Sequence, residues 1–483
     1  MFMDDARAQV WNQVQNKGLR VFAEFLTPTV LADAARHCGR RLSKNPLNLA
    51  RLAWLGVACA LYLAKNFTNV LTITFKLLAD SSALETQQPR RLSRRQRARG
   101  RKRRSKHDPR RADPTMVSEE AFAKARTHMP LAYWIALAVL LADRFAQEQA
   151  QALHWKRFRL LALDGTLLNL PRWQALRDHF GAARNQKGGR IPQARLLLLQ
   201  FPLARVPYRF ALAPKSKSEK TLAASLLGQL QANDLVLIDR GFWSFGLFCQ
   251  IERQQAFFAI RQIKQAHLKV LHRLGPHDTL VRFAPRDKTW RRQGLPQALT
   301  LRRIGYQIRG FRPSALITNV TNPASISRNE WLGLATDAAG QVLDHALYHR
   351  RWEIETTFAE LKVQQGLKRL RSRTPQSMYY EIAGHVLLYL MIRWLMVKAA
   401  QTHGHDPLRL SFIEALREIQ DQLPALITSS ARRVQTILLP RLLARIAEHQ
   451  VPERLGRHYP RPNDTKTRNL GNGRRQLPSK LAA

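Results

Sequence analysis

Two aspartates follow the two most apolar strand-like runs of the sequence, and their positions suggest a site for chemistry. Asp164 ends the run LLALD and precedes Gly-Thr, and Asp239 ends the run LVLID and precedes Arg-Gly. Side chains at the carboxyl ends of strands in an open sheet face the crevice where ligands bind. Each motif taken alone is also a good turn sequence. Because both follow the most apolar strands of a basic protein, we expect the two carboxylates to converge on one site.

A third carboxylate comes from the segment YHRRWEIETTFAELK, residues 348–362, whose periodicity predicts a helix. At about 100° per residue, four functional side chains fall within roughly 60° of one helix face. They are Tyr348, Arg351, Glu355 and Lys362. Glu353 and Glu360 project roughly 140° or more away from Glu355. An ordinary Arg351–Glu355 ion pair on an exposed helix is the simpler alternative. Such a pair would not require Tyr348 and Lys362 on the same face, so we predict that Glu355 is the third acid.

Apolar periodicity predicts the elements that must position these residues. Short apolar runs bounded by Pro, Gly and Asn predict strands, and the later ones alternate with helix-like segments, which favours a mixed α/β core. Further strand-like runs between Leu268 and Val320 indicate a β-rich insertion. The predicted core strands are the runs 157–170, 194–201, 206–213, 235–239 and 256–263.

Changes in periodicity and charge divide the chain into eight predicted segments. These are a helical N-terminal region at 1–87, a basic flexible linker at 88–115, a helical segment at 116–157, the first part of the core at 158–265, the β-rich insertion at 266–343, the second part of the core with the helix of Glu355 at 344–400, a helical C-terminal region at 401–450 and a basic tail at 451–483.

The charge balance points to an acidic partner. The 483 residues include 79 Lys and Arg against 34 Asp and Glu, a formal net charge of +45. A compact fold tolerates such self-repulsion best beside a polyanion. Thirteen basic residues lie between Arg90 and Arg111, where no apolar periodicity supports a core. We expect this run to bind phosphate, and a solubilising linker is the alternative.

Other common sites are not indicated. The three cysteines are far apart and form no CxxC pair, and no GxxxxGK[ST] loop is present, so we expect no disulfide framework, zinc site or nucleotide cofactor. The longest clean apolar runs, 52–64 and 131–142, are shorter than the roughly 20 residues that span a bilayer. We therefore expect a cytoplasmic protein without a membrane partner.

The same residues resemble a known family. The Y-x2-R-x3-E-x6-K spacing from Tyr348 to Lys362 resembles the signature of bacterial DDE transposases of the insertion-sequence-four type. DGT at Asp164 and DRGFW at Asp239 resemble the motifs of that family's first and second acidic residues. The resemblance implies an RNase H-like α/β catalytic core with a β-rich insertion, flanked by helical N- and C-terminal regions. It also implies that region 1–87 binds DNA, that the segment 344–400 carries the catalytic helix and that the protein is associated with the bacterial nucleoid.

The resemblance also implies a cut-and-paste reaction on double-stranded DNA, both element ends and target, within an assembly of more than one subunit. Asp164, Asp239 and Glu355 would be catalytic and hold two Mg²⁺ ions, with Mn²⁺ as a substitute, while Tyr348, Arg351 and Lys362 would bind DNA. Phosphodiester cleavage agrees with this set, because two ions activate the attacking oxygen and stabilise the leaving one, and Mg²⁺ prefers carboxylate oxygens.

Two other functions stay open from the sequence. The first is an RNase H-like nuclease or resolvase that hydrolyses DNA without joining ends. The second is a catalytically decayed relative that only binds DNA. Strand transfer of a 3′-hydroxyl end separates the transposase from the nuclease, and metal-dependent nicking excludes the decayed relative.

Overall fold

The computed structural model describes residues 22, 24–42, 47–62, 119–184, 190–285, 294–307, 313–333 and 347–452. The linker predicted at 88–115 lies outside the described residues, as does the basic tail except for residues 451 and 452.

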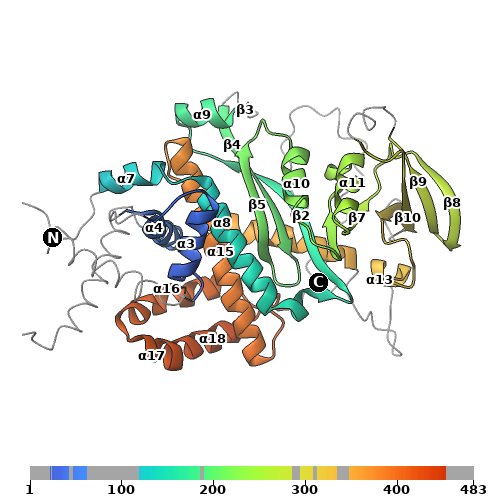
Figure 1. The fold of residues 1–483 in the computed structure, drawn as a ribbon. Coiled ribbons are helices and arrows are strands. Elements are labelled where there is room, and N and C mark those ends of the chain that lie inside the picture. The colour runs from blue at the N-terminus through green and yellow to red at the C-terminus, as the bar shows by residue number, and fades with distance from the viewer. Residues whose placement is uncertain are drawn as a thin grey trace, which may run out of the picture.

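The centre of the molecule is a sheet whose middle five strands have an RNase H-like arrangement (Figure 1). Three strands form an antiparallel meander, and two more continue the sheet in parallel with the first of them. Their order across the sheet is β5-β4-β2-β6-β7. The strands are β2 (Phe158–Asn169), β4 (Arg190–Phe201), β5 (Val206–Pro214), β6 (Asp234–Ile238) and β7 (Phe257–Arg261). Apolar runs at these positions therefore became strands, as their composition predicts.

The strands predicted between Leu268 and Val320 extend this same sheet beyond β7. Each pairs antiparallel with its neighbour, and β11 joins the extension to β7. In Figure 1 they lie at the end of the molecule opposite α4 (Leu49–Leu61). The four strands are β8 (Leu268–Gly275), β9 (Asp278–Phe283), β10 (Leu299–Tyr306) and β11 (Ser314–Thr318), followed by the short helix α13 (Arg328–Leu332). Two short strands, β1 (His154–Trp155) and β3 (Ala182–Arg184), pair with β2 and β4.

Helices cover both faces of the sheet and form a helical part beside it, and the buried side chains of sheet and helices belong to one hydrophobic core. On one side of the sheet lie α10 (Glu219–Leu227) and α11 (Phe245–Arg253). A Cβ at Gly165 in β2 would lie 2.1 Å from a Glu219 carboxylate oxygen, so α10 packs directly on that face. The remaining helices are α3 (Pro28–His37), α7 (Glu119–Thr127), α8 (Leu131–Glu148), α9 (Gln174–Phe180), α14 (Glu353–Ala359), α15 (Pro375–His403), α16 (Phe412–Thr428), α17 (Ala431–Arg433) and α18 (Leu439–Glu448).

The 29-residue helix α15 is the centre of the helical part. It packs against α4, α8 and α18, and 94% of its most apolar 18-residue stretch is buried. Within the described residues, α15 has the length and the apolar composition that a membrane-spanning helix needs. The bent pair α7–α8 meets the same criteria when its two helices are taken together. Its burial marks it as a core helix, because a helix that is apolar all round needs partners on every side.

Candidate active site

Asp164 lies within β2 and not at the end of a strand, which corrects the prediction from sequence. The strand continues to Asn169 because the antiparallel neighbour β4 pairs with it as far as Gln193. The parallel neighbour β6 stops earlier, since its last pair is Ile238 with Leu163. Asp164 is therefore the first residue beyond the parallel pairing, and its Gly165 is extended strand instead of turn. The carboxylate accepts a hydrogen bond of 2.7 Å from the Gly165 N–H.

Asp239 directly follows β6 and lies across from Asp164, because both residues come next after the Leu163–Ile238 pair. Its carboxylate caps a short 3-10 turn, where it accepts a hydrogen bond of 3.1 Å from the Gly241 N–H. The register of the two strands is held at their other end by a buried ion pair. Arg159 donates from Nε and Nη2 to the two carboxylate oxygens of Asp234, at 2.6 and 2.8 Å.

Glu355 comes from a helical segment that is less regular than predicted. Residues 347–352 form a 3-10 turn, α14 covers 353–359, and a π turn covers 360–364. Tyr348 and Lys362 thus lie outside the regular α-helix, so the constant 100° spacing holds only for its central part. Ile354 and Phe358 are buried and anchor α14 against the core. Such π turns are frequent at functional sites.

The guanidinium of Arg351 lies between the three acids. Its Nη1 is 3.6 Å from Asp164 Oδ2, and its Nη2 is 3.4 Å from Glu355 Oε1 and 4.0 Å from Asp239 Oδ1. The Arg351 side chain is 7% exposed, whereas those of Asp164, Asp239 and Glu355 are 21, 41 and 45% exposed. The ordinary Arg351–Glu355 pair considered from sequence is present, but it is one of three contacts of the same cation.

Burial and like charge act together on Asp164. Loss of solvent raises the pKa of its carboxyl to about 6, and the neighbouring Asp239 and Glu355 charges add to this. The Gly165 N–H and the Arg351 guanidinium act in the opposite direction. A buried carboxylate crowded by two others is stabilised by any cation that reaches it.

The other two predicted residues contact protein atoms beside the acids. Tyr348 donates its hydroxyl hydrogen to the Ile238 carbonyl at 2.9 Å, next to Asp239, and burial raises its pKa to about 12. Lys362 donates to the Thr166 hydroxyl, and partial burial lowers its pKa. The structure therefore brings all six predicted residues to one place. Their roles in catalysis, metal binding and DNA binding stay predictions.

Sequence reasoning missed the residues that hold these groups in place. Thr166 follows Asp164 by two positions, so strand alternation places both on the same face and could have indicated it. Arg205 binds Glu353 of α14 and Glu360 at the start of the π turn, on the side away from Glu355. Nothing in the sequence around Arg205 indicates that contact, because it joins segments that are far apart in the chain.

The donor set fits a hard divalent cation in its chemistry. Three carboxylates face one position that already attracts a positive group, and Mg²⁺ prefers such oxygens. Within the described ranges, no three His, Cys, Asp or Glu side chains are close enough to hold one ion among them. The contacts of Arg351 account for this spacing, since its guanidinium lies between the acids.

Comparisons with known proteins agree with this geometry. Residues 155–391 match the family model described as the transposase DDE domain. The transposase InsG of insertion sequence element IS4 from Escherichia coli (strain K12) is 28% identical over 320 residues, which are 64% of this chain and 68% of that protein. The putative transposase InsZ from the same organism is 28% identical over 115 residues, 23% of this chain and 37% of that protein.

A solved structure also resembles the chain. The piggyBac transposase synaptic complex with hairpin DNA, determined by cryo-EM, is 11% identical and gives a TM-score of 0.40, with 90% of this chain and 85% of that chain covered. A TM-score of this size is too low to bear on the fold, which rests on the strand order.

These matches support an insertion-sequence transposase of the DDE type, a class of enzymes of metal-dependent DNA cleavage and strand transfer. The predicted recognition, RNase H-like fold class and transposase function are thereby confirmed. Neither relative favours a nuclease without strand transfer or an inactive DNA-binding protein.

Proposed function

We propose that Asp164, Asp239 and Glu355 are the catalytic acids of this transposase and hold two Mg²⁺ ions, with Mn²⁺ as a substitute. The observation that supports this most is the position of Arg351, whose guanidinium is within 4.0 Å of a carboxylate oxygen from each acid. Three acids from two strands and one helix meet there although they are distant in the sequence. Bound ions would activate the attacking oxygen and stabilise the leaving oxygen of a phosphodiester.

The protein contributes fixed orientation to this chemistry. The Gly165 and Gly241 N–H groups orient the carboxylates of Asp164 and Asp239. Glu355 is held by a helix whose opposite side is buried. Carboxylates with fixed positions lose little entropy when they bind an ion, and second contacts of this kind strongly affect metal sites.

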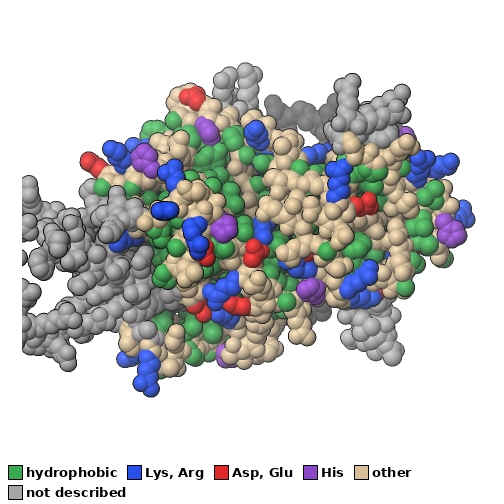
Figure 2. Space-filling model, in the orientation of Figure 1, with side chains coloured by type: hydrophobic (Ala, Val, Ile, Leu, Met, Phe, Trp, Pro, Cys, Tyr) green, Lys and Arg blue, Asp and Glu red, His purple; other side chains and the backbone are tan. Residues whose placement is uncertain are grey.

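Double-stranded DNA, as element end and as target, is the proposed substrate, and the active form is an assembly of more than one subunit with DNA. Arg351, Lys362 and Tyr348 would act on backbone phosphate or on the groups that face it, without reading bases. Lys and Arg side chains are more widespread than Asp and Glu on the face shown in Figure 2, which suits a polyanion. We place the protein in the cytoplasm beside the nucleoid.

Strand transfer is the experiment that tests the whole proposal. The full-length chain is incubated with a short duplex that carries the element's terminal inverted repeat with a free 3′-hydroxyl, together with supercoiled plasmid and Mg²⁺. Joining of the labelled end to the plasmid is the expected result, with Mn²⁺ able to replace Mg²⁺ and EDTA abolishing the product. Nicking without joining would support the nuclease, and neither product would support the inactive relative.

A further inference from the structure

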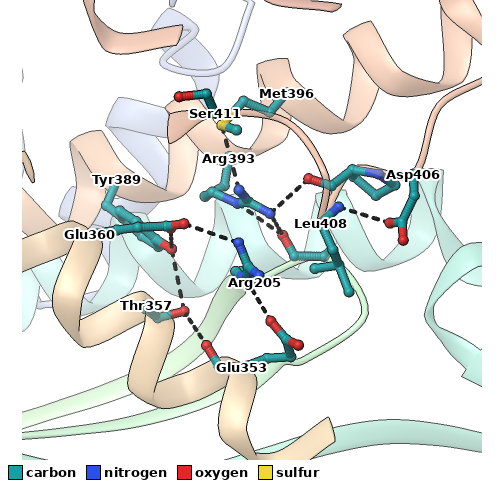
Figure 3. Close-up of polar contacts among 12 residues, drawn as sticks. Arg205, Glu353, Thr357, Glu360, Tyr389, Arg393, Met396, Asp406, Leu408 and Ser411 are labelled. Atoms are coloured by element: carbon teal, nitrogen blue, oxygen red, sulfur yellow. Dashed lines mark hydrogen bonds and ion pairs between the residues drawn. The ribbon is translucent and has the colours of Figure 1, made fainter. Parts of the chain in front are cut away.

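The side of the catalytic helix that faces away from Glu355 is held by one arginine. Arg205 Nε donates to Glu353 Oε2 at 2.7 Å, and its Nη1 donates to Glu360 Oε1 at 3.1 Å (Figure 3). The Arg205 side chain is 13% exposed, so solvent screens these contacts little. Glu353 and Glu360 are two helical turns apart and lie on either side of Glu355 along the chain.

A hydroxyl network supports the same face. The buried Tyr389 of α15 donates to Glu360 Oε2 at 2.5 Å and lies 3.3 Å from the Thr357 hydroxyl. Thr357 in turn donates to the Glu353 carbonyl at 3.2 Å. Figure 3 shows Glu360 between Tyr389 and Arg205, so both oxygens of this buried carboxylate have partners. Satisfied buried networks of this kind fix one arrangement of their members.

The turn that carries Arg205 is itself fixed to the core. Arg205 is the last residue of the loop between β4 and β5 and has a left-handed backbone, with φ of 52°. Arg393 of α15, fully buried, donates from Nε and Nη2 to the preceding carbonyl of Ala204 at 3.1 and 2.9 Å. A non-glycine residue in this conformation persists where its surroundings hold it. Arg205 thus connects the catalytic helix to α15 through a fixed turn.

The two ion pairs of Arg205 restrict rotation of the catalytic helix about its own axis. One contact would leave the helix free to turn about its axis, but contacts at 353 and 360 hold it before and after Glu355. Glu360 also begins the π turn, in which the Gln365 N–H donates to the Glu360 carbonyl at 2.8 Å. The position of Glu360 therefore affects the orientation of Glu355, which lies five residues earlier in the same helical segment.

We propose that Arg205 is a positioning residue for DNA cleavage, which fixes the direction of Glu355 by binding Glu353 and Glu360 on the reverse side of the helix. This inference rests on the proposed function, in which Glu355 binds metal. Arg205 itself touches neither the three acids nor DNA in this role. Its loss should therefore change the metal requirement of the enzyme and leave its attraction to DNA unchanged.

The test compares Arg205→Met and Arg205→Lys with a matched control, Arg209→Lys. Arg209 lies in β5, four residues after Arg205, and pairs with Asp143 of α8 at 2.7 Å. Its replacement therefore also weakens a half-buried ion pair between this hairpin and a helix. Measurements are free Mn²⁺ by EPR during titration of the full-length protein, the Mg²⁺ dependence of single-turnover end cleavage, and the Kd for end DNA in Ca²⁺.

We expect Arg205→Met to weaken Mn²⁺ binding and cleavage by about 10- to 100-fold, as for other residues that orient metal ligands. Arg205→Lys should recover part of this, because it keeps the charge with one contact. The Kd for DNA should stay within about twofold of wild type, and Arg209→Lys should bind Mn²⁺ normally. Wild-type Mn²⁺ binding by folded Arg205→Met, or an equal loss in Arg209→Lys, would overturn the inference.

Two further variants keep the result interpretable. If Arg205→Met does not fold, Glu360→Gln removes one of the two anchors with little change in size. An unchanged Mn²⁺ affinity in Glu360→Gln would contradict the inference in the same way. Glu355→Gln separates the two proposals: normal cleavage by that variant contradicts the proposed function, whereas inactive Glu355→Gln beside a normal Arg205→Met contradicts only the role of Arg205.

Discussion

The guanidinium of Arg351 lies 3.6 Å from the carboxylate of Asp164, although the two residues belong to segments far apart in the chain. The same guanidinium reaches Asp239 and Glu355. One buried positive charge thus partly balances three negative charges. Any divalent ion held by these acids interacts with the same oxygens, which connects Arg351 to both stability and metal binding.

Replacement of the three acids is the first prediction. Asp164→Asn, Asp239→Asn and Glu355→Gln should each lower end cleavage by at least about a thousandfold, because each removes a ligand from ions that stabilise the transition state by several kcal/mol. Folding and DNA binding should be retained, as seen by circular dichroism and by gel shift in Ca²⁺. A variant that cleaves at the wild-type rate in Mg²⁺ has lost no metal ligand.

The second prediction concerns Arg351 in the absence of metal. Arg351→Gln leaves the three carboxylates without their shared cation, so the free energy of unfolding in EDTA should fall by about 1 to 3 kcal/mol, less than for a fully buried pair because the acids are partly exposed. Added Ca²⁺ should stabilise this variant more than wild type, as measured by urea denaturation. Arg144→Gln, which breaks the exposed Arg144–Glu148 pair of α8, is the control. An equal response to Ca²⁺ in all three proteins would contradict the prediction.

Lys362 should hold DNA phosphate in the engaged complex. Lys362→Met should weaken binding of the cognate end whatever base lies nearby, and the slope of log K against log salt should become shallower by about one unit. Lys398→Met is the matched control, since Lys398 of α15 pairs with Glu24 near the N-terminus. Titrations of end DNA at several salt concentrations provide the measurement. Altered sequence preference with unchanged affinity for the cognate end would mean that Lys362 does not act on the backbone.

His385 should make the folded protein sensitive to acid. Burial lowers its pKa to about 3, and its Nδ1 lies 3.2 Å from the Gln365 amide nitrogen at the end of the π turn. The unfolded chain takes up this proton below about pH 6.5 while the folded protein does not, so stability is present above pH 6.5 and is lost as the pH falls.

The measurement compares wild type with His385→Leu by urea denaturation between pH 7 and pH 5. Wild type should lose about 2 kcal/mol more than the variant over this range, since 1.5 pH units below the unfolded pKa correspond to about that free energy. Parallel pH profiles for the two proteins would show that His385 does not titrate on unfolding.

The basic run from Arg90 to Arg111 lies outside the described residues, and its role remains a prediction from sequence. If about 6 to 10 of its thirteen basic residues contact phosphate, its replacement by a Gly/Ser linker of equal length should make the salt slope shallower by about 5 to 9 units. Random-sequence duplex is the substrate for this comparison, and recognition of the element end should survive. Equal slopes would identify the run as a solvated linker.

Local pattern in the sequence was enough to predict the core strands, the helical segment around Glu355 and the meeting of the three carboxylates. Apolar runs such as LVLID become strands because their side chains are buried on both faces, and this depends on near neighbours in the chain. The four-residue spacing of Arg351 and Glu355 likewise predicts their contact, which is present although Arg351 lies in the 3-10 turn that precedes α14. The separation of Glu353 and Glu360 from Glu355 follows from the same geometry.

Only the tertiary structure decided how far each strand continues and which groups meet. Asp164 lies inside β2 because β4, paired from the other side, extends five residues beyond it, and no local signal reports the length of a partner strand. The π turn at Glu360 and the ion pairs of Arg205 with Glu353 and Glu360 arise where a loop between two strands meets a distant helix. Contacts of this kind depend on how the whole chain packs, so they have no period in the sequence from which they could be predicted.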